Sequence, residues 1–343
     1  MVQVSYSGFL WQRLWQSALT LLGLAVIMFL VSRVIPGDPA RLSLGPLATD
    51  SQVTALRHDL GLDRPLINQF GVYLAGVAHG DFGQSLVTRQ AVASDLASRL
   101  PATLELVFAS ILLVGIIGVL LGALGARYQG TWFDTLIRIF SLLGVVAPSF
   151  FVGIALQLIF GYYLNVLPVS GQLNLDTVYS GKPTGMALLD GLLTGNGALA
   201  WDALRHLILP AFALALGDLG QLARVTRANM LDNSRKDYMR AQRSYGIPGV
   251  LLTFKYLLRP SFIPSLTLLG LAFASLLGNA FLVELVFSWP GIASYASNAI
   301  LQKDFNAIMG VVLIFGVFFI IASILVDLLA GVVNPRLRLM GQR

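Results

Sequence analysis

Long apolar runs alternate with shorter polar segments along the whole chain. A helix needs about 20 apolar residues to cross the roughly 30 Å hydrocarbon core of a bilayer. Six segments satisfy this requirement, namely residues 14–34, 103–126, 139–164, 207–225, 261–283 and 307–333. Helices are expected because an open backbone in lipid leaves its N–H and C=O groups unpaired. The pattern therefore predicts an all-α polytopic membrane protein with six transmembrane helices.

The composition supports a membrane protein. The 343 residues are 56% hydrophobic and 12% charged, and the mean hydropathy is +0.76. A soluble domain of this size would neither bury nor expose so much apolar surface without aggregating. The first apolar run is longer than the core of a typical signal peptide, and no cleavage site of small residues follows at 32–36. We expect it to be a retained membrane anchor.

Basic residues predict the orientation. Eight of the 23 Lys and Arg residues lie between two spans: Arg224, Arg227, Arg235, Lys236, Arg240, Arg243, Lys255 and Arg259. Short cytoplasmic loops carry such an excess, so both termini are expected in the cytoplasm, whereas the outer loop 289–306 holds only Lys303. The net charge of +6 follows from this topology, and no basic stripe with interleaved aromatic residues indicates nucleic-acid binding.

Two long segments are predicted on the outer face. Residues 36–101 contain helix signals, and the Gly80–Gly83 stretch predicts a turn. This segment is expected to be a small helical periplasmic insertion between the first span (1–35) and a core of five spans (102–343). Residues 171–205 are polar and rich in glycine, and the sequence leaves open whether they are disordered or form a binding element.

The basic inner loop, residues 224–259, contains a candidate short helix. Asp237 is suited to be its N-cap, Gly246 to take the left-handed conformation after its end, and Pro248 to prevent its continuation. A capped helix between two spans can transmit a push from a soluble partner. The alternative is a helix in the headgroup layer, with its arginines against anionic lipid.

The sequence gives little support for chemistry on this chain. The pair Gly181–Lys182 lacks the remaining residues of a phosphate-binding loop, so ATP would be bound by another chain. The three histidines lack metal-ligand spacing, and there is no cysteine. A serine protease built on Ser170 and His206 lacks the expected glycine context, because Pro168 stands there. We expect no enzyme activity, no metal and no cofactor bound by this chain.

Nine short motifs occur in order along the chain. They are Leu-Gly-Leu-Asp-Arg-Pro at 60–65, Gly-Asp-Phe-Gly at 80–83, Leu-Pro-Ala-Thr-Leu-Glu-Leu at 100–106, Pro-Ser-Phe at 148–150, Leu-Pro-Val-Ser-Gly at 167–171, Arg-His-Leu-Ile-Leu-Pro at 205–210, the loop helix at 237–246, Val-Glu-Leu-Val-Phe-Ser-Trp-Pro-Gly at 283–291 and Asn-Pro-Arg at 334–336. Together they resemble the dipeptide/oligopeptide/nickel class of permeases in binding-protein-dependent ABC importers. The resemblance covers nearly the whole chain and implies the type I importer permease fold.

The resemblance implies that the loop helix is a coupling helix seated on a cytoplasmic ATPase subunit. The residues concerned are Asp237, Tyr238, Arg240, Ala241, Arg243, Tyr245, Gly246 and Pro248. Tyr245 departs from the basic residue usual in the class, Ala293 replaces a glycine, and Asn334 replaces an aspartate. The implied partners are a second homologous permease, two ATPase subunits that use ATP and Mg²⁺, a periplasmic or lipid-anchored binding protein, and lipid of the bacterial inner membrane.

Four residues are candidates for the pathway or its gate. Asp218 lies about 9 Å along the helix axis inside Arg224, where a charge facing lipid would cost several kcal/mol. We expect it either to line the pathway and favour substrates with a positive group, or to pair with an arginine of a neighbouring helix. Glu284 is placed by the resemblance near an outer gate, with pairing inside the helix bundle as the alternative. Pro148 beside Gly144 is expected to kink the third span.

The rival class is an autonomous secondary transporter or channel. Such a protein is expected to carry several paired ionisable residues at the membrane midplane and broken helices in two halves. This chain offers essentially Asp218 alone and no evident inverted repeat. The solute is left open among peptides, nickel, metal chelates and small peptide-like compounds, because the separate binding protein usually selects it.

Overall fold

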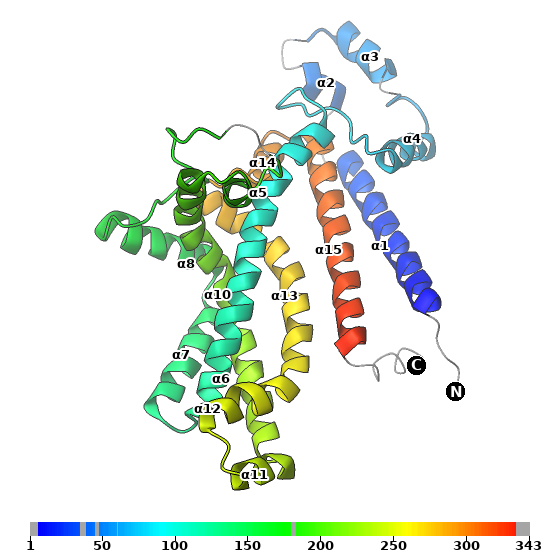
Figure 1. Ribbon diagram of the computed structural model, residues 1–343. Helices are drawn as coiled ribbons and strands as arrows, with labels where there is room; N and C mark the ends of the chain where they lie inside the picture. The colour runs from blue at the N-terminus through cyan, green and yellow to red at the C-terminus, as the bar shows by residue number, and fades with distance from the viewer. Residues whose placement is uncertain (1–5, 35–38, 45–47, 60, 180–182, 334–343) are drawn as a thin grey trace. The chain divides into compact units, whose positions relative to one another are not determined.

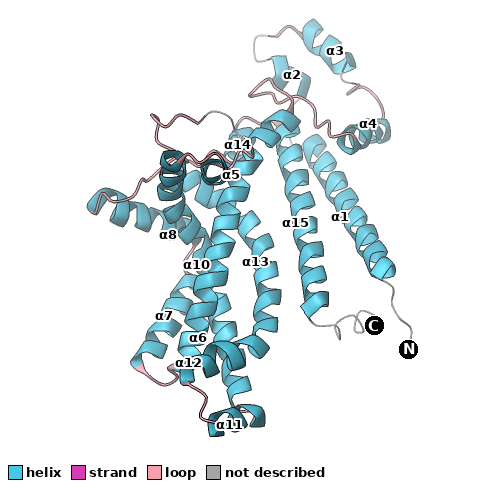
Figure 2. Ribbon diagram, viewed as in Figure 1, coloured by secondary structure: helices cyan, strands magenta, loops and turns pink. Residues whose placement is uncertain are grey.

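The computed structural model describes residues 6–34, 39–44, 48–59, 61–179 and 183–333. These residues form helices joined by loops, and their only strand-like pairing is an isolated bridge between Gln84 and Ala91 (Figure 2). The motif at 334–336 lies outside the described residues. Within them, the predicted all-α class is confirmed.

Long helices account for the predicted spans (Figure 1). They are α1 (Tyr6–Val34), α5 (Val92–Leu113) continued by the π-turn η1 (Val114–Gly118) and α6 (Val119–Arg127), α10 (Gly197–Ser234), α12 (Gly249–Leu251) continued by η3 (Leu252–Leu257) and α13 (Leu258–Val286), and α15 (Phe305–Val333). Among the described residues, five helices are long and apolar enough to cross a membrane, or six when one bent pair counts as a single span. The predicted number of six is reached in that way.

The third span differs from the continuous segment expected at 139–164. It consists of α7 (Trp132–Val146), then α8 (Ser149–Leu156) continued by η2 (Gln157–Tyr163), and the two parts meet at 111°. Pro148 stands at this break as the N-cap of α8. Proline has no N–H for the preceding turn, and its ring clashes with that turn. The expected kink is therefore a full break between two helices.

Two other spans are longer than their apolar cores. The amphipathic stretch from residue 92 continues without interruption through Pro101 into the second span. Helix α10 begins ten residues before the apolar run and has 38 residues in all. The remaining short helices are α2 (Pro39–Leu44), α3 (Asp50–Asp59), α4 (Leu66–Ala78), α9 (Ala187–Leu193), α11 (Asp237–Ser244) and α14 (Ile292–Leu301).

Two compact units divide the chain: unit 1 comprises Met1–Leu100 and Gly291–Ile320, and unit 2 comprises Pro101–Pro290 and Ile321–Arg343. In unit 1, Gly80 and Gly83 have positive φ angles, which confirms the predicted turn. The buried carboxylate of Asp304 accepts hydrogen bonds from the Ser85 hydroxyl at 2.6 Å and from the Ala307 N–H at 3.1 Å. This contact joins the segment after that turn to the start of α15.

Helix α10 is the centre of unit 2 and packs against α6, α7, α8, α9 and α13. Its side chains Leu219 and Leu222 are fully buried with Val114 of η1. The crossing with α7 is close because glycines face backbone on both sides. A Cβ on Gly144 would lie 2.7 Å from the Leu216 carbonyl oxygen, and one on Gly220 would lie 2.4 Å from that of Ser141. Larger side chains at these two positions would force the helices apart.

Candidate functional site

The predicted loop helix is present as α11, with one difference at its start. Lys236 is the N-cap, and Asp237 lies in the first turn without a capping hydrogen bond. The predicted N-cap role of Asp237 is therefore wrong. Its exposed carboxylate instead lies 3.7 Å from Arg240 on the next turn, and an acidic residue in the first turn still favours the helix through its dipole. Gly246 has φ +71°, as predicted for the residue that ends the helix. Pro248 begins the next element as the N-cap of α12.

One apolar side chain attaches α11 to the rest of unit 2. Met239 is fully buried, together with Ala123 of α6, Met230 of α10 and Leu257 of η3. The sequence reasoning missed this residue. The signal was an isolated apolar residue in a polar helix, since burial is the ordinary reason for such a residue.

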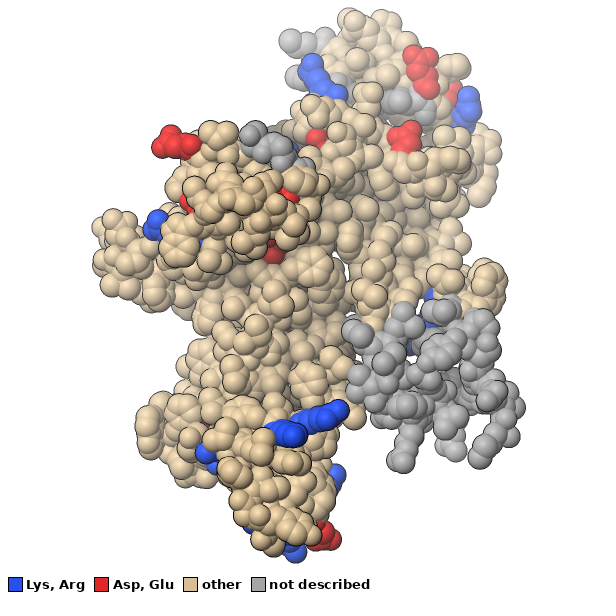
Figure 3. Space-filling view, in the orientation of Figure 1, with Lys and Arg blue, Asp and Glu red and all other residues tan. Residues whose placement is uncertain are grey.

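Most of the other side chains of α11 are exposed, whereas Gln242 is partly buried with its Oε1 atom out of solvent. Tyr238 is 38% exposed and Tyr245 is 82% exposed, and Arg240, Ala241 and Arg243 are exposed as well. Lys and Arg side chains gather at this end of unit 2, and a broad band free of charge lies next to it on the face shown in Figure 3. The predicted coupling residues thus form an exposed, largely basic and aromatic surface on a helix whose one fully buried side chain is Met239. We call this surface the α11 surface.

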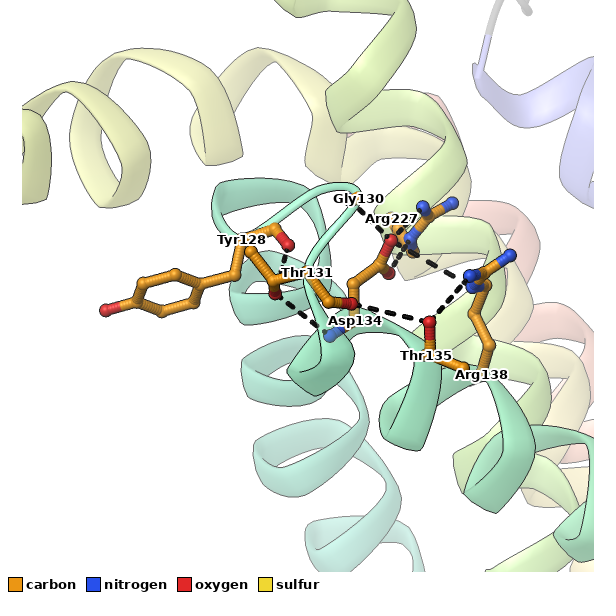
Figure 4. Close-up of polar contacts among 7 residues, drawn as sticks. All are labelled: Tyr128, Gly130, Thr131, Asp134, Thr135, Arg138 and Arg227. Atoms are coloured by element: carbon orange, nitrogen blue, oxygen red, sulfur yellow. Dashed lines mark hydrogen bonds and ion pairs between the residues drawn. The ribbon is translucent and has the colours of Figure 1, made fainter.

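A buried ion pair braces the same end of unit 2. Asp134, near the start of α7, is 1% exposed and accepts two hydrogen bonds from Arg227 of α10, at 2.7 and 2.8 Å. Figure 4 shows this two-pronged contact, together with the Gly130 N–H that donates to the same carboxylate at 3.1 Å. Bidentate arginine–carboxylate pairs fix geometry as well as charge. The pair therefore ties α7 to α10 two turns before α10 ends.

Three of the four candidate pathway residues lie together. Gly144, Pro148 and Asp218 line one cavity of about 360 Å³ at the break between α7 and α8, with α10 and α13 forming its other walls. Asp218 makes no hydrogen bond or ion pair with any described residue. The predicted alternative, pairing with an arginine of a neighbouring helix, is therefore not found among the described residues.

Glu284 does not line this cavity. It is fully buried near the end of α13 and accepts a hydrogen bond from the Thr103 hydroxyl of α5 at 2.6 Å. Close by in sequence, the Trp289 indole N–H donates to the Ala102 carbonyl at 2.8 Å. Through these contacts Glu284 and Trp289 hold the end of α13 and the turn that follows it against α5 in this conformation.

Buried carboxylates organise residues 171–205, which the sequence left open between disorder and a binding element. Asp190 of α9 accepts hydrogen bonds from Thr184, Tyr179 and Gly185. Asp202 of α10 accepts three hydrogen bonds from the Asn174 N–H, the Asn174 amide and the Thr177 hydroxyl. The described part of this segment is therefore folded.

The pKa of Asp190 reflects the same contacts. Burial alone would raise it, but the hydrogen bonds from Thr184, Tyr179 and Gly185 outweigh burial and hold the pKa below its ordinary value of 3.8. The carboxylate is consequently ionised at neutral pH, and its contacts contribute stability that is lost only as the pH falls through that lowered pKa.

The residues weighed for other chemistry are not assembled. His206 is buried, and its Nδ1 atom lies 2.9 Å from the Asp202 carbonyl oxygen. Among the described residues, no hydrogen bond joins it to Ser170. In the part of the chain that the structure describes, no group of three or more His, Asp or Glu residues is placed to hold a metal ion.

Comparison with known proteins agrees with this arrangement. Residues 118–339 match the family described as the binding-protein-dependent transport system inner membrane component, and residues 7–107 match its N-terminal companion. The chain is 41% identical over 334 residues to the probable D,D-dipeptide transport system permease protein DdpB of Escherichia coli K12, covering 97% of this chain and 98% of the relative.

Two further relatives are similar over 93% of this chain and 95% of their own length. The di/tripeptide transport system permease protein DppB of Pseudomonas aeruginosa UCBPP-PA14 is 39% identical, and the glutathione transport system permease protein GsiC of E. coli K12 is 34% identical. The chain therefore belongs to the inner membrane permease family of binding-protein-dependent ABC importers. The resemblance noted in the sequence is confirmed.

Proposed function

We propose that this chain is one of two permease subunits of an ATP-driven importer for di- and tripeptides or solutes of similar build. The observation that carries the proposal is the near full-length similarity to permeases whose names specify D,D-dipeptides, di/tripeptides and glutathione. None of these names mentions nickel, so small peptides are the substrate class we propose.

The proposed assembly contains a second homologous permease, two cytoplasmic ATPase subunits that bind ATP and Mg²⁺, and a substrate-binding protein on the outer side. In this arrangement the termini and the α11 surface face the cytoplasm. The excess of Lys and Arg at that end of unit 2 supports this orientation. The described part of the segment 171–205, at the other end of α10, is the proposed contact for the binding protein.

The α11 surface is the proposed seat of the ATPase. It presents exposed tyrosines and arginines, and Met239 fastens the helix to α6, α10 and η3. A helix held in this way moves with its neighbours rather than bending alone, because packed interfaces shift between discrete arrangements. Only Arg235 and Lys236 separate α10 from α11, so a displacement of α11 reaches α10 directly.

The Asp134–Arg227 pair carries the proposed movement from α10 to α7. Helix α7 ends at the break next to Pro148, where no continuous backbone ladder resists a change of angle. Closure of the ATPase pair would therefore change the tilt of α7 relative to α8 and expose the pathway alternately to the two sides. ATP binding would favour the outward-open state, and hydrolysis would restore the inward-facing one.

Substitution of Ala241 tests the coupling assignment. Ala241 is exposed between the turns that carry Tyr238 and Tyr245, so Ala241→Glu places a charge and extra volume in the proposed contact. Ala55→Glu is the matched control, since Ala55 is an exposed alanine on α3. We expect Ala241→Glu to reduce co-purification of the ATPase subunits and dialanine uptake at least about tenfold, which corresponds to about 1.4 kcal/mol, and Ala55→Glu to leave both unchanged.

The measurement uses the full complex in proteoliposomes with its binding protein, ATP and radiolabelled dialanine. Retention of the ATPase subunits and of uptake in Ala241→Glu would show that α11 is not the contact. Concentrative uptake of dialanine by the purified chain alone, without ATPase subunits, would instead refute the importer assignment and indicate an autonomous carrier.

A further inference from the structure

The cavity at the break between α7 and α8 has a partly polar lining. Its lining includes Asp218 and Gln221 of α10 and Asn279 of α13. Its volume of about 360 Å³ is near the lower end of the range for small-molecule sites, roughly 300–1,000 Å³. None of the lining residues is Lys, Arg or His. The cavity therefore carries a negative group and no positive side chain of its own.

Asp218 is left without a partner inside the described chain. It is half-buried on a spanning helix, and none of the described residues donates a hydrogen bond to it or forms an ion pair with it. Ionisable side chains inside membrane proteins ordinarily face water, a pathway or a charged partner, because an isolated charge in hydrocarbon is costly. Asp218 therefore faces water, a charged group of another subunit or the transported solute across this cavity.

Neutral hydrogen-bond acceptors belong to other residues that line the same cavity. In a continuous helix the N–H of residue 148 would donate to the carbonyl of Gly144, but residue 148 is proline and has no N–H. Both Gly144 and Pro148 line the cavity. The C-terminal end of α7 adds the negative end of a helix dipole. The amide nitrogen of Asn279 donates to the Ser275 hydroxyl at 3.3 Å, which leaves its carbonyl oxygen as an acceptor.

We propose that this cavity is a subsite for the ammonium group of the transported peptide. The inference rests on the proposed function, because it assigns one end of the proposed substrate to a place on the proposed pathway. An ammonium group supplies one positive charge and three N–H donors, which matches one carboxylate surrounded by neutral acceptors. A divalent metal ion fits less well, since Ca²⁺ takes about six to eight oxygen ligands and, among the described residues, no group of three or more His, Asp or Glu is placed to hold a metal ion.

Absence of cysteine from the chain allows a direct test. Leu282→Cys places a single thiol on the cavity wall and leaves every acceptor in place. In the assembled transporter, we compare its modification by cationic 2-aminoethyl methanethiosulfonate and by neutral methyl methanethiosulfonate. Adding Asp218→Asn should lower the ratio of the cationic to the neutral rate at least about fivefold, since the carboxylate attracts the cationic reagent and not the neutral one. Asp232→Asn, an exposed carboxylate on the same helix, should leave the ratio unchanged.

The second measurement concerns the ligand. Dialanine at tens of millimolar, without the binding protein, should slow modification of the thiol introduced by Leu282→Cys, whereas N-acetyl-dialanine should not. Asp218→Asn should abolish the difference between the two peptides, and Asp218→Glu should keep it.

The outcomes separate the two proposals. An unchanged rate ratio in Asp218→Asn would mean that a cation of another subunit already neutralises the carboxylate, and it overturns the subsite. Equal protection by both peptides overturns the subsite as well, while the transport function stands if the unmodified complex takes up dialanine. A complex that does not transport dialanine at all overturns the proposed function together with its subsite.

Discussion

The two polar segments of unit 2 that flank α10 are held in opposite ways. The segment from residue 171 to the start of α10 is fixed by buried carboxylates that collect hydrogen bonds from several turns of chain. The α11 segment is fixed by one apolar side chain, Met239, and its own carboxylate is 98% exposed. The first arrangement holds an irregular loop in one shape. The second leaves a regular helix free to present nearly its whole surface to another protein.

The largest expected effect concerns the hydrogen-bonded segment. Asp190→Ala removes a 1% exposed acceptor together with the hydrogen bonds that Tyr179, Thr184 and Gly185 donate to it. We expect a loss of about 3–5 kcal/mol from the unfolding free energy. Thermal unfolding in detergent and the rate of proteolytic cleavage within 171–196 measure it.

Asp176→Ala is the control for this substitution, because Asp176 is an exposed aspartate of the same segment. Equal stability of the two variants would show that Asp190 does not hold the loop together.

The second prediction concerns the apolar anchor of α11. Met239→Ala empties a fully buried position, for which a cost of about 2–5 kcal/mol is typical. The loss falls on the attachment of α11, so we expect ATP hydrolysis to continue while dialanine uptake per ATP hydrolysed falls several-fold. Met239→Leu conserves volume and should retain coupling. Normal dialanine uptake per ATP hydrolysed in Met239→Ala would show that the Met239 side chain does not transmit movement.

The smallest expected effect concerns the brace between the helices. Arg227→Lys keeps the charge opposite Asp134 but loses one of the two parallel hydrogen bonds. We expect a loss of about 1–2 kcal/mol in stability. We also expect less dialanine uptake per ATP hydrolysed, with the ATPase subunits still bound. Arg224→Lys, on the same helix, is the control. If both variants transport alike, the bidentate geometry is dispensable.

The sequence predicted those features that depend on neighbouring residues. The apolar runs indicated the spans, Gly246 indicated the end of α11, and Pro148 indicated a bend. The start of α11 was predicted one residue too late. Asp237 is a residue type that suits an N-cap, but the N-cap is Lys236. The angle of 111° at Pro148 was not predictable, because a proline allows a range of bends and tertiary packing selects one.

Contacts between distant residues were beyond the sequence. Asp134 and Arg227 are 93 residues apart, and nothing in either neighbourhood identifies the other. The donors around Asp190 come from an irregular loop whose path is set by the carboxylate itself. Met239 carried a weak signal as the lone buried side chain of a polar helix, but its partners on α6, α10 and η3 emerge only from the fold.

The length of α10 has one more consequence. Its 38 residues extend about 57 Å, nearly twice the thickness of the hydrocarbon core. Its first turns hold Asp202, around which the outer segment folds, and its last turns hold Met230, against which Met239 packs. One continuous helix, with Pro210 inside it, thus connects the two polar segments. In the proposed assembly, a binding protein docking at one end and a nucleotide-driven push at the other would act on the same helix.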